Sequence, residues 1–321
     1  METSHIMNNQ VNESRRLALK KMGFAVAGAL AATTGVLPLV SCGSTGRKRR
    51  TVLYFTGTGN CFHVARELAG ADGEMLSIPQ LMKDGRFDIE ADEIGIVYPI
   101  YGHMPPNMVR KFIEKANLKA DYLFAVLTYG NRHANAVEIW DDIARGAGKT
   151  FDYINTLIMV DNWLPGFDMA QQIKSLPEKK VPEHIAALRA DIDRRRKFIA
   201  PVTEEDREQQ RQFLQRSGLD PAVGFLMKSE NYFRADSNTC IGCGVCVQVC
   251  PKANWRLDPW PMAEGDCEFC FACIQNCPQK SIQFIESEDN AFAKHGELNP
   301  KARYRNEHVS LYDIKASNSQ F

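Results

Sequence analysis

The chain has 321 residues, of which 44% are hydrophobic and 24% are charged. This ordinary globular composition excludes wholesale disorder, and the length allows two domains. Its 39 basic and 39 acidic residues give a formal charge of zero, whereas proteins that bind nucleic acid normally carry a basic excess. We therefore expect no nucleic-acid partner.

The N-terminal segment has the pattern of an export signal. Residues 14–20, SRRLALK, resemble the twin-arginine signature, and an apolar run over residues 22–40 follows. Residues 39–42, LVSC, resemble a bacterial lipobox, where the signal is cut before a cysteine that receives the lipid. The resemblance implies a signal peptide over residues 1–41 and a lipid anchor on Cys42, which would hold the protein at the extracytoplasmic face of a bacterial cell membrane. A plain transmembrane anchor is the open alternative, because about 20 apolar residues span a bilayer.

The first predicted strand, residues 51–55, leads into a glycine-containing loop and then into a helix predicted over residues 61–68. The loop reads Thr56-Gly57-Thr58-Gly59-Asn60. Such a loop before a helix N-terminus forms an anion site, because backbone N–H groups converge on the anion and the helix dipole favours its charge. A dinucleotide fingerprint would need a glycine in place of Phe62, and a P-loop would need a lysine and a hydroxyl directly after Gly59.

Three more strands and two more helices are predicted further along the chain. The predicted strands are residues 94–97, 122–127 and 155–160, and the predicted helices are residues 107–116 and 135–145. Alternating strands and helices of this length indicate a parallel sheet that helices cover on both faces.

The glycine loop resembles the FMN-phosphate loop of flavodoxins, with Cys61 where a Thr or Ser hydroxyl is common. The resemblance implies an α/β flavodoxin-like domain over residues 50–165. Its doubly wound parallel sheet, in the order 2-1-3-4-5, would bind FMN at the carboxyl ends of the strands. The loops after the third and fourth strands would hold the ring, with Tyr101 and Tyr129 as the stacking candidates. The candidate FMN-binding residues are Thr56, Gly57, Thr58, Gly59, Asn60, Cys61, Tyr101, Gly102, Thr128, Tyr129, Gly130 and Asn131.

Several aromatic residues near these loops keep alternative interpretations. For Tyr101 and Tyr129, packing in the core or on the surface is the alternative to stacking on a flavin. Trp163 either caps the flavin or closes the sheet edge, and the sequence does not decide between the two. His103 and His133 are expected to be solvent-facing loop residues, and we assign no catalytic residue.

Residues 166–230 are polar and largely helical in pattern, with apolar residues between positions 186 and 199 spaced along one face. We interpret this segment as a helical connector that packs the two domains together. The charge run Arg194–Lys197 is interpreted as a solvated helix face, with a membrane-surface patch as the alternative.

Eight cysteines between residues 240 and 277 form two copies of the spacing C-x2-C-x2-C-x3-C-P, offset by 27 residues. The repeat extends to apolar positions, where Trp255 corresponds to Ile282. Soft thiolates suit iron–sulfur clusters. Structural zinc would need only two C-x2-C pairs, and disulfides, although ordinary in exported proteins, do not explain a repeat of four ligands.

These runs resemble those of bacterial two-cluster ferredoxins, in which the fourth cysteine of each run ligates the other cluster. The resemblance implies a small α+β ferredoxin-like domain over residues 231–287 with two [4Fe-4S] clusters. The first cluster would take Cys240, Cys243, Cys246 and Cys277, and the second would take Cys267, Cys270, Cys273 and Cys250.

The whole arrangement, with a tail over residues 288–321 that has no ligand spacing, resembles the fused flavodoxin–ferredoxin family often labelled EFR1-type. The resemblance implies an electron-transfer protein that moves electrons between the clusters and a bound FMN and exchanges them with redox protein partners. Two alternatives stay open. One is a flavin-dependent oxidoreductase that acts on a small-molecule acceptor such as a quinone, and the other is a redox sensor whose clusters serve structure or signalling.

Overall fold

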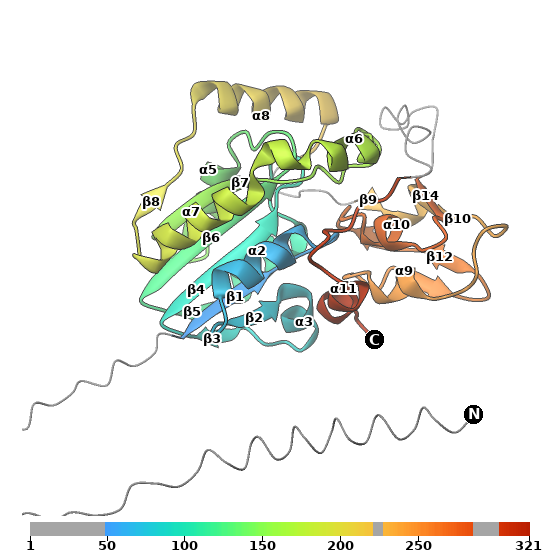
Figure 1. The fold of residues 1–321 in the computed structure, drawn as a ribbon, viewed down its shortest axis with the longest axis horizontal. Helices are drawn as coiled ribbons and strands as arrows, with labels where there is room; N and C mark the ends of the chain where they lie inside the picture. The colour runs from blue at the N-terminus through green and yellow to red at the C-terminus, as the bar shows by residue number, and fades with distance from the viewer. Residues whose placement is uncertain (1–48, 221–226, 285–301) are drawn as a thin grey trace, which may run out of the picture. The chain divides into compact units, whose positions relative to one another are not determined.

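The computed structural model describes residues 49–220, 227–284 and 302–321, all of which belong to one compact unit (Figure 1). The signal peptide predicted over residues 1–41 and the lipid anchor predicted at Cys42 lie outside the described residues. No helix within the described ranges has the length and apolar character needed to cross a membrane.

The first domain is built on a parallel sheet with the strand order β2-β1-β4-β6-β7-β8 (Figure 1). Its strands are β1 (Arg50–Tyr54), β2 (Glu74–Ser77), β4 (Glu93–Pro99), β6 (Tyr122–Tyr129), β7 (Tyr153–Ile158) and β8 (Phe198–Ile199). A separate parallel pair consists of β3 (Asp88–Glu90) and β5 (Asn117–Lys119). Counted within the sheet, the first five strands have the predicted order 2-1-3-4-5, which confirms the flavodoxin-like fold. The short edge strand β8 was not predicted.

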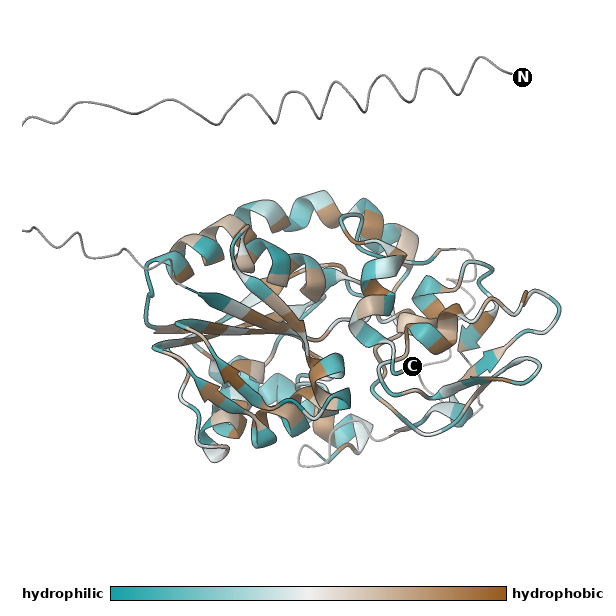
Figure 2. Ribbon diagram, turned by 90° about the horizontal axis from the view of Figure 1, so that it is seen from below, coloured by the Kyte–Doolittle hydropathy of each residue, from teal (hydrophilic) through white to brown (hydrophobic). Residues whose placement is uncertain are grey.

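Helices cover both faces of this sheet. They are α2 (Asn60–Ala69), α3 (Ile78–Lys83), α4 (Asn107–Lys115), α5 (Ala136–Gly146) and α7 (Val181–Asp193). Because successive residues of a strand point to opposite faces, Val52 and Tyr54 of β1 pack with α2 and α7, whereas Leu53 packs with α4 and α5. In Figure 2 the strands of this sheet are largely hydrophobic, and the helices beside them carry both hydrophobic and hydrophilic residues.

The predicted connector, residues 166–230, is largely helical in its described part, but one detail of the interpretation is wrong. Its further elements are α6 (Met169–Lys174), a 3-10 helix (Leu176–Lys179) and α8 (Glu204–Ser217). Helix α7 ends before Arg194–Lys197, so this charge run is not a helix face, although three of its four residues are exposed. Nε of Arg195 donates to Glu93 (2.8 Å), and Arg50 donates to the other carboxylate oxygen (2.8 Å). Glu93 is 1% exposed, and two cations compensate its buried charge.

The second domain is a small α+β fold around the eight predicted cluster cysteines, which confirms the expected fold class. Its elements are β9 (Met227–Lys228), a 3-10 helix (Ser229–Asn231), β10 (Phe233–Ala235), α9 (Val245–Gln248), β11 (Trp255–Leu257), β12 (Pro261–Ala263), β13 (Asp266–Cys267), α10 (Ala272–Asn276) and β14 (Ile282–Phe284). β10 pairs with β14 and β11 pairs with β12, both antiparallel. Trp255 and Ile282, which correspond in the sequence repeat, begin β11 and β14.

The C-terminal tail, residues 302–321, joins the two domains. It contains α11 (Leu311–Asn318), which starts at a serine–aspartate capping box. The side-chain amide of Asn318 donates to the backbone O of Thr56 in the first domain (2.9 Å) and to that of Val249 in the second (3.2 Å). Asn318 is fully buried, at 0% exposure. The tail therefore has a structural role that its sequence did not suggest.

Replacing Asn318 by alanine is expected to lower the free energy of unfolding by about 1–3 kcal/mol, because the change strips two buried carbonyls of a donor. The matched control is Ser319→Ala. Among the described residues, the Ser319 hydroxyl accepts only from the backbone N–H of Phe321 (3.4 Å), so this change is expected to stay within about 0.5 kcal/mol. Denaturant titration of both variants measures the difference, and equal losses would contradict the bridging role of Asn318.

Candidate functional site

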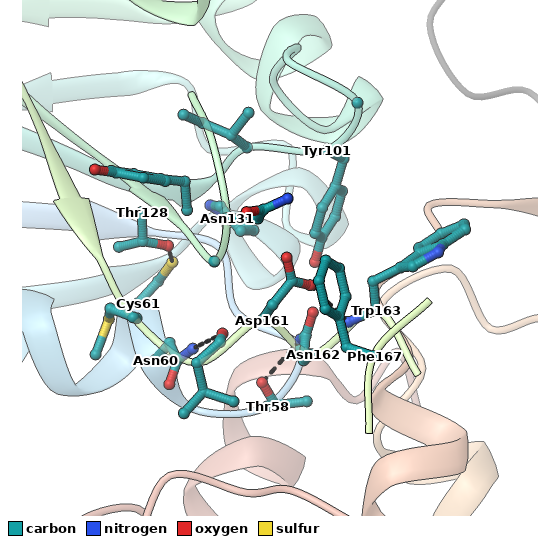
Figure 3. Close-up of a pocket in the computed structure, with 18 of the residues that line it drawn as sticks. Thr58, Asn60, Cys61, Tyr101, Thr128, Asn131, Asp161, Asn162, Trp163 and Phe167 are labelled. Atoms are coloured by element: carbon teal, nitrogen blue, oxygen red, sulfur yellow. Dashed lines mark hydrogen bonds between the residues drawn. The ribbon is translucent and has the colours of Figure 1, made fainter. Parts of the chain in front are cut away.

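A pocket of about 250 Å³ opens at the carboxyl ends of β1, β4, β6 and β7. A doubly wound sheet places its ligand here, since the loops on either side of the switch point converge. Eleven of the twelve predicted FMN-binding residues line this pocket, and the exception is Gly59. Figure 3 shows Thr58, Tyr101, Asn131 and other side chains from these loops gathered around it.

The loop between β1 and α2 has the backbone geometry of an anion cradle. Gly59 has a φ of +97°, a left-handed conformation that suits glycine, and its N–H donates to Oγ1 of Thr56 (3.1 Å). No side chain caps α2, whose first residues Asn60 and Cys61 line the pocket. The helix N-terminus, with its partial positive charge, therefore faces the place where an anion would bind.

The C-terminal tail braces this loop. A Cβ on Gly59 would come within 3.1 Å of Asn306, so this glycine lies against the tail instead of lining the pocket. The backbone N–H of Asn306 donates to O of Thr58 (2.8 Å). The Tyr304 hydroxyl donates to Oδ1 of Asn60 (2.6 Å). The tail thus fixes the shape of the loop from outside.

Tyr101 brings an unpartnered hydroxyl to the wall of the pocket. The hydroxyl oxygen is buried and has no hydrogen-bond partner among the described residues. Burial raises the pKa of Tyr101 well above its ordinary value. Buried polar groups normally have a partner, so this hydroxyl fits a pocket that holds a polar ligand. The turn that follows it has Gly102 and His103 in left-handed conformations, at φ +53° and +67°.

The expectation that His103 faces solvent is wrong. His103 is 5% exposed, its Nδ1 lies 2.6 Å from Oε1 of Gln210, and its ring packs on that of Phe213 (4.8 Å). Both partners belong to α8, and Gln210 lies 107 residues further along the chain, so no local pattern could show this burial. His133 is half-buried, with its ring edge-on to that of Tyr129 (5.1 Å).

The loop after β7 also lines the pocket, and the sequence analysis gave it no firm role. Its pocket residues are Met159, Val160, Asp161, Asn162, Trp163 and Phe167, of which Figure 3 labels the last four. Nδ2 of Asn162 donates to Oγ1 of Thr58 (2.9 Å), and burial raises the pKa of Asp161. The ring of Trp163 stacks on that of Phe269 in the second domain (6.0 Å, 26°). These residues come directly after a buried strand, and that position in the sequence could have indicated that they line the pocket.

Cys61 stands where the flavodoxin loop commonly has a Thr or Ser hydroxyl, and its thiol is neutral. Its Sγ lies 3.1 Å from Oγ1 of Thr128, and both residues line the pocket. Cys61 is 1% exposed, and burial raises the pKa of its thiol to about 12. The thiol therefore keeps its proton at neutral pH.

The eight clustered cysteines come together in two groups of four. Burial raises the pKa of Cys246 to about 12, and its thiol interacts electrostatically with those of Cys240, Cys243 and Cys277. Cys273 interacts electrostatically first with Cys267, Cys270 and Cys250, which form the second group with it, and then with Cys246 of the first group. These are the two sets that the ferredoxin resemblance implies, and the ligand role of each cysteine stays a prediction.

The two groups differ in exposure. Cys243 of the first group is exposed, whereas Cys270 and Cys273 of the second are buried. Within the described ranges, no three His, Cys, Asp or Glu side chains converge closely enough to hold one metal ion. A cubane takes one cysteine on each of four irons, so its ligands stand further apart than those of a single ion.

The second cysteine group lies directly against the pocket of the first domain. A Cβ on Gly57 would lie 2.3 Å from the backbone O of Cys270, so only glycine allows this approach. Nδ2 of Asn276 donates to O of Gly57 (3.4 Å). Nε2 of Gln275 donates to O of Asn162 (3.0 Å). The cluster-binding loop and the anion loop therefore form one junction.

A carboxylate from the same cysteine loop reaches across the junction. Glu268 is 4% exposed, and burial raises the pKa of its carboxyl, whereas Lys252 and the backbone N–H groups of Met108 and Asn107 at the start of α4 lower it. Helix α4 has Pro106 at its N-cap and no side-chain cap of its own. A carboxylate at the N-terminus of a helix stabilises that helix, because its negative charge lies at the positive end of the helix dipole. The loop of the second cysteine group is thus tied to the element that follows Tyr101.

Residues 232–289 match the family described as 4Fe-4S dicluster domain, which supports iron–sulfur clusters in this domain. Similar solved structures include a flavoprotein from Lactobacillus acidophilus in complex with FMN (15% identity, 34% of this chain and 93% of that chain, TM-score 0.27). Another is the two-electron reduced flavodoxin of Megasphaera elsdenii (20% identity, 33% and 84%, TM-score 0.26). These structural likenesses are too weak to support a function. No curated protein matches the chain.

Replacing Gly57 by alanine is expected to separate the anion loop from the second cysteine group, because the new Cβ would collide with the Cys270 carbonyl at 2.3 Å. We expect a lower midpoint of unfolding and a lower iron content per chain. Gly146→Ala is the control, since a Cβ there meets nothing within 4 Å. Iron analysis and thermal unfolding compare the two variants. A Gly57→Ala variant with the iron content and unfolding midpoint of the wild type would refute the close contact.

Replacing Cys61 by serine is expected to reduce the loss of stability at high pH. The thiol pKa rises from 9.0 to about 12 on folding, so the unfolded chain loses this proton first and stability falls as pH rises through that range. Between about pH 7.5 and about pH 10.5, the fall should be about 2 kcal/mol smaller in Cys61→Ser than in the wild type. Denaturant titration at both pH values measures it, and identical falls would show that the thiol is not held neutral by the fold.

Proposed function

We propose that this protein is an electron carrier that moves electrons between two [4Fe-4S] clusters and an FMN bound at the carboxyl ends of the sheet. The observation that carries the proposal is the backbone contact between Gly57 and Cys270. It joins the anion loop to the loop that would ligate the second cluster. A membership in the EFR1-type fused flavodoxin–ferredoxin family is part of the same proposal.

The residues of the pocket fit an FMN. For the phosphate, the loop from Thr56 to Asn60 offers backbone that two glycines leave free of side chains, followed by a helix N-terminus that no side chain caps. Tyr101 and Trp163 supply aromatic rings, and the unpartnered Tyr101 hydroxyl offers a donor to the polar part of a flavin. When bound, FMN exchanges one electron with a cluster or two with a substrate, whereas the protein binds and orients it.

The exposure of the cysteines suggests where a partner would dock. Cys243 of the first group is exposed, whereas Cys270 of the second is buried beside the pocket. The first cluster would therefore exchange electrons with a redox protein at the surface, and the second would connect it to the flavin. Cys273 interacts electrostatically with Cys246 of the first group, which places the two groups next to each other.

A carrier fits the pocket better than an enzyme for small acceptors. The pocket volume is about 250 Å³, at or below the roughly 300–1,000 Å³ of typical small-molecule sites. One flavin ring would occupy that space, and a quinone beside it would need more. We therefore propose redox proteins, and not a small molecule, as the partners that exchange electrons with this protein.

Membrane attachment at the extracytoplasmic face, through a lipid on Cys42 after twin-arginine export, completes the proposal. It is supported only by residues 14–42, which lie outside the described ranges. A diacyl anchor supplies the two chains that stable attachment requires. Radiolabelled fatty acid should be incorporated by the wild type and not by Cys42→Ala, and equal labelling would overturn the anchor.

Anaerobic reconstitution is expected to give about eight irons and one FMN per chain. Thr58→Asp should lose FMN but keep its iron, because a carboxylate in the anion loop repels the phosphate. The matched control, Thr58→Ser, keeps the hydroxyl that accepts from Asn162 and should bind FMN like the wild type. Cys270→Ser should lose about four irons and keep FMN. Four irons or no flavin in the wild type would overturn the proposal.

Electron exchange within the chain has a separate test. Flash photoreduction that delivers less than one electron per chain should be followed by redistribution between the cluster and flavin absorbance bands. Within one polypeptide this rate is independent of protein concentration. A rate proportional to concentration would show that the cofactors exchange electrons only between molecules, which contradicts the proposed route through the Gly57–Cys270 junction.

A further inference from the structure

The two copies of the cysteine repeat differ at the left-handed positions of their ligand loops. In the first copy these positions are Gly242 and Gly244, at φ +66° and +69°. At the same places 27 residues later stand Phe269 and Phe271, at φ +53° and +56°. A side chain in this conformation costs about 1–2 kcal/mol. The second copy therefore carries strain that the first copy avoids.

The strain in the second copy accompanies two buried rings. A Cβ on Gly242 or Gly244 would meet nothing within 4 Å, so the first copy leaves these positions open. Phe269 and Phe271 are only 2% and 1% exposed. Strained backbone persists only where the surroundings hold it, and it is a reason to look for a role of the side chain.

Phe269 reaches the pocket of the other domain. Among the described residues 227–284, it is the one that lines the pocket at the carboxyl ends of the sheet. Its ring stacks on that of Trp163 (6.0 Å, 26°), which also lines the pocket. Phe269 thus belongs both to the ligand loop of the second cysteine group and to the wall of the anion pocket.

Phe271 has the same backbone strain, a similar burial and two of the same core neighbours, since Phe269 also packs on Phe233 (5.7 Å) and Phe284 (6.4 Å). The ring of Phe271 meets Trp163 edge-on (5.1 Å, 83°) and packs on Phe233 (5.7 Å) and Phe284 (6.1 Å). It does not line the pocket. The same core rings pack both phenylalanines, so the feature that distinguishes Phe269 is its place in the wall of the pocket.

We propose that Phe269 is a flavin-binding residue that the iron–sulfur domain contributes to the pocket of the flavodoxin-like domain. This inference rests on the proposed function, because it requires FMN in the pocket. Together with Trp163 and Tyr101, the ring of Phe269 encloses the flat cofactor, and aromatic contacts of this kind contribute beyond the area that they bury. The flavin is then held by both domains, and neither domain alone has a complete site.

The test is the dissociation constant of FMN, measured by fluorescence titration of the cluster-loaded protein. Phe269→Gly removes the ring and restores the residue of the first copy, so strain is relieved while binding weakens roughly tenfold. Phe271→Gly relieves the same strain and removes a ring that does not itself line the pocket, so its dissociation constant should stay within about twofold of the wild type. Iron content should remain about eight per chain in both variants.

The outcomes separate the inference from the proposed function. A wild type that binds no FMN overturns the proposed function and this inference with it. A wild type that binds FMN, with equal dissociation constants for Phe269→Gly and Phe271→Gly, overturns this inference alone. Should Phe269→Gly lose iron, Phe269→Leu keeps bulk and strain and should still weaken FMN binding about threefold. Unchanged binding in Phe269→Leu would overturn the role of the ring.

Discussion

The backbone contact between Gly57 and the carbonyl of Cys270 is the constraint on which the relation between the two domains depends. Any side chain at position 57 would hold the two loops apart. The neighbouring contacts require the same closeness, since Glu268 reaches the first amides of α4 and Phe269 stacks on Trp163. A single absent Cβ therefore permits a packed junction between an anion loop and a cysteine loop, and the proposed electron route follows that junction.

Much of the fold and of the site could be predicted because the signals are local. Buried parallel strands appear as short apolar runs, and their alternation with helices indicated the parallel sheet that the structure has. The strand order 2-1-3-4-5 came from the resemblance to flavodoxins, and the structure has that order. The loop after β1 needs glycine where φ is positive, as at Gly59, and that requirement is visible in the sequence. The cysteine spacing reflects the corners of a cubane, and the structure groups the same two sets of four thiols.

What could not be predicted involves partners distant in the chain. His103 lies under α8, and Arg195 reaches the buried carboxylate of Glu93, 102 residues away. The burial of His103 and of Glu93 leaves no periodic pattern in the sequence, because a single helix turn covers the histidine and a single arginine helps to cover the carboxylate. Phe269 at the pocket wall was also missed, although comparison with Gly242 in the first copy would have marked it as an anomaly. Long-range packing, not local propensity, decides these positions.

The brace on the anion loop has a consequence for the order of folding. Asn318 and Thr56 lie 262 residues apart, and Asn306 and Asn60 lie 246 apart. Contacts between such distant segments form late, because the entropy lost in closing the chain must first be offset by other contacts. During synthesis, a nascent chain would have both its sheet and its cysteine loops before the tail could bind the anion loop. Stable binding of FMN at that loop would then require the whole chain to have folded.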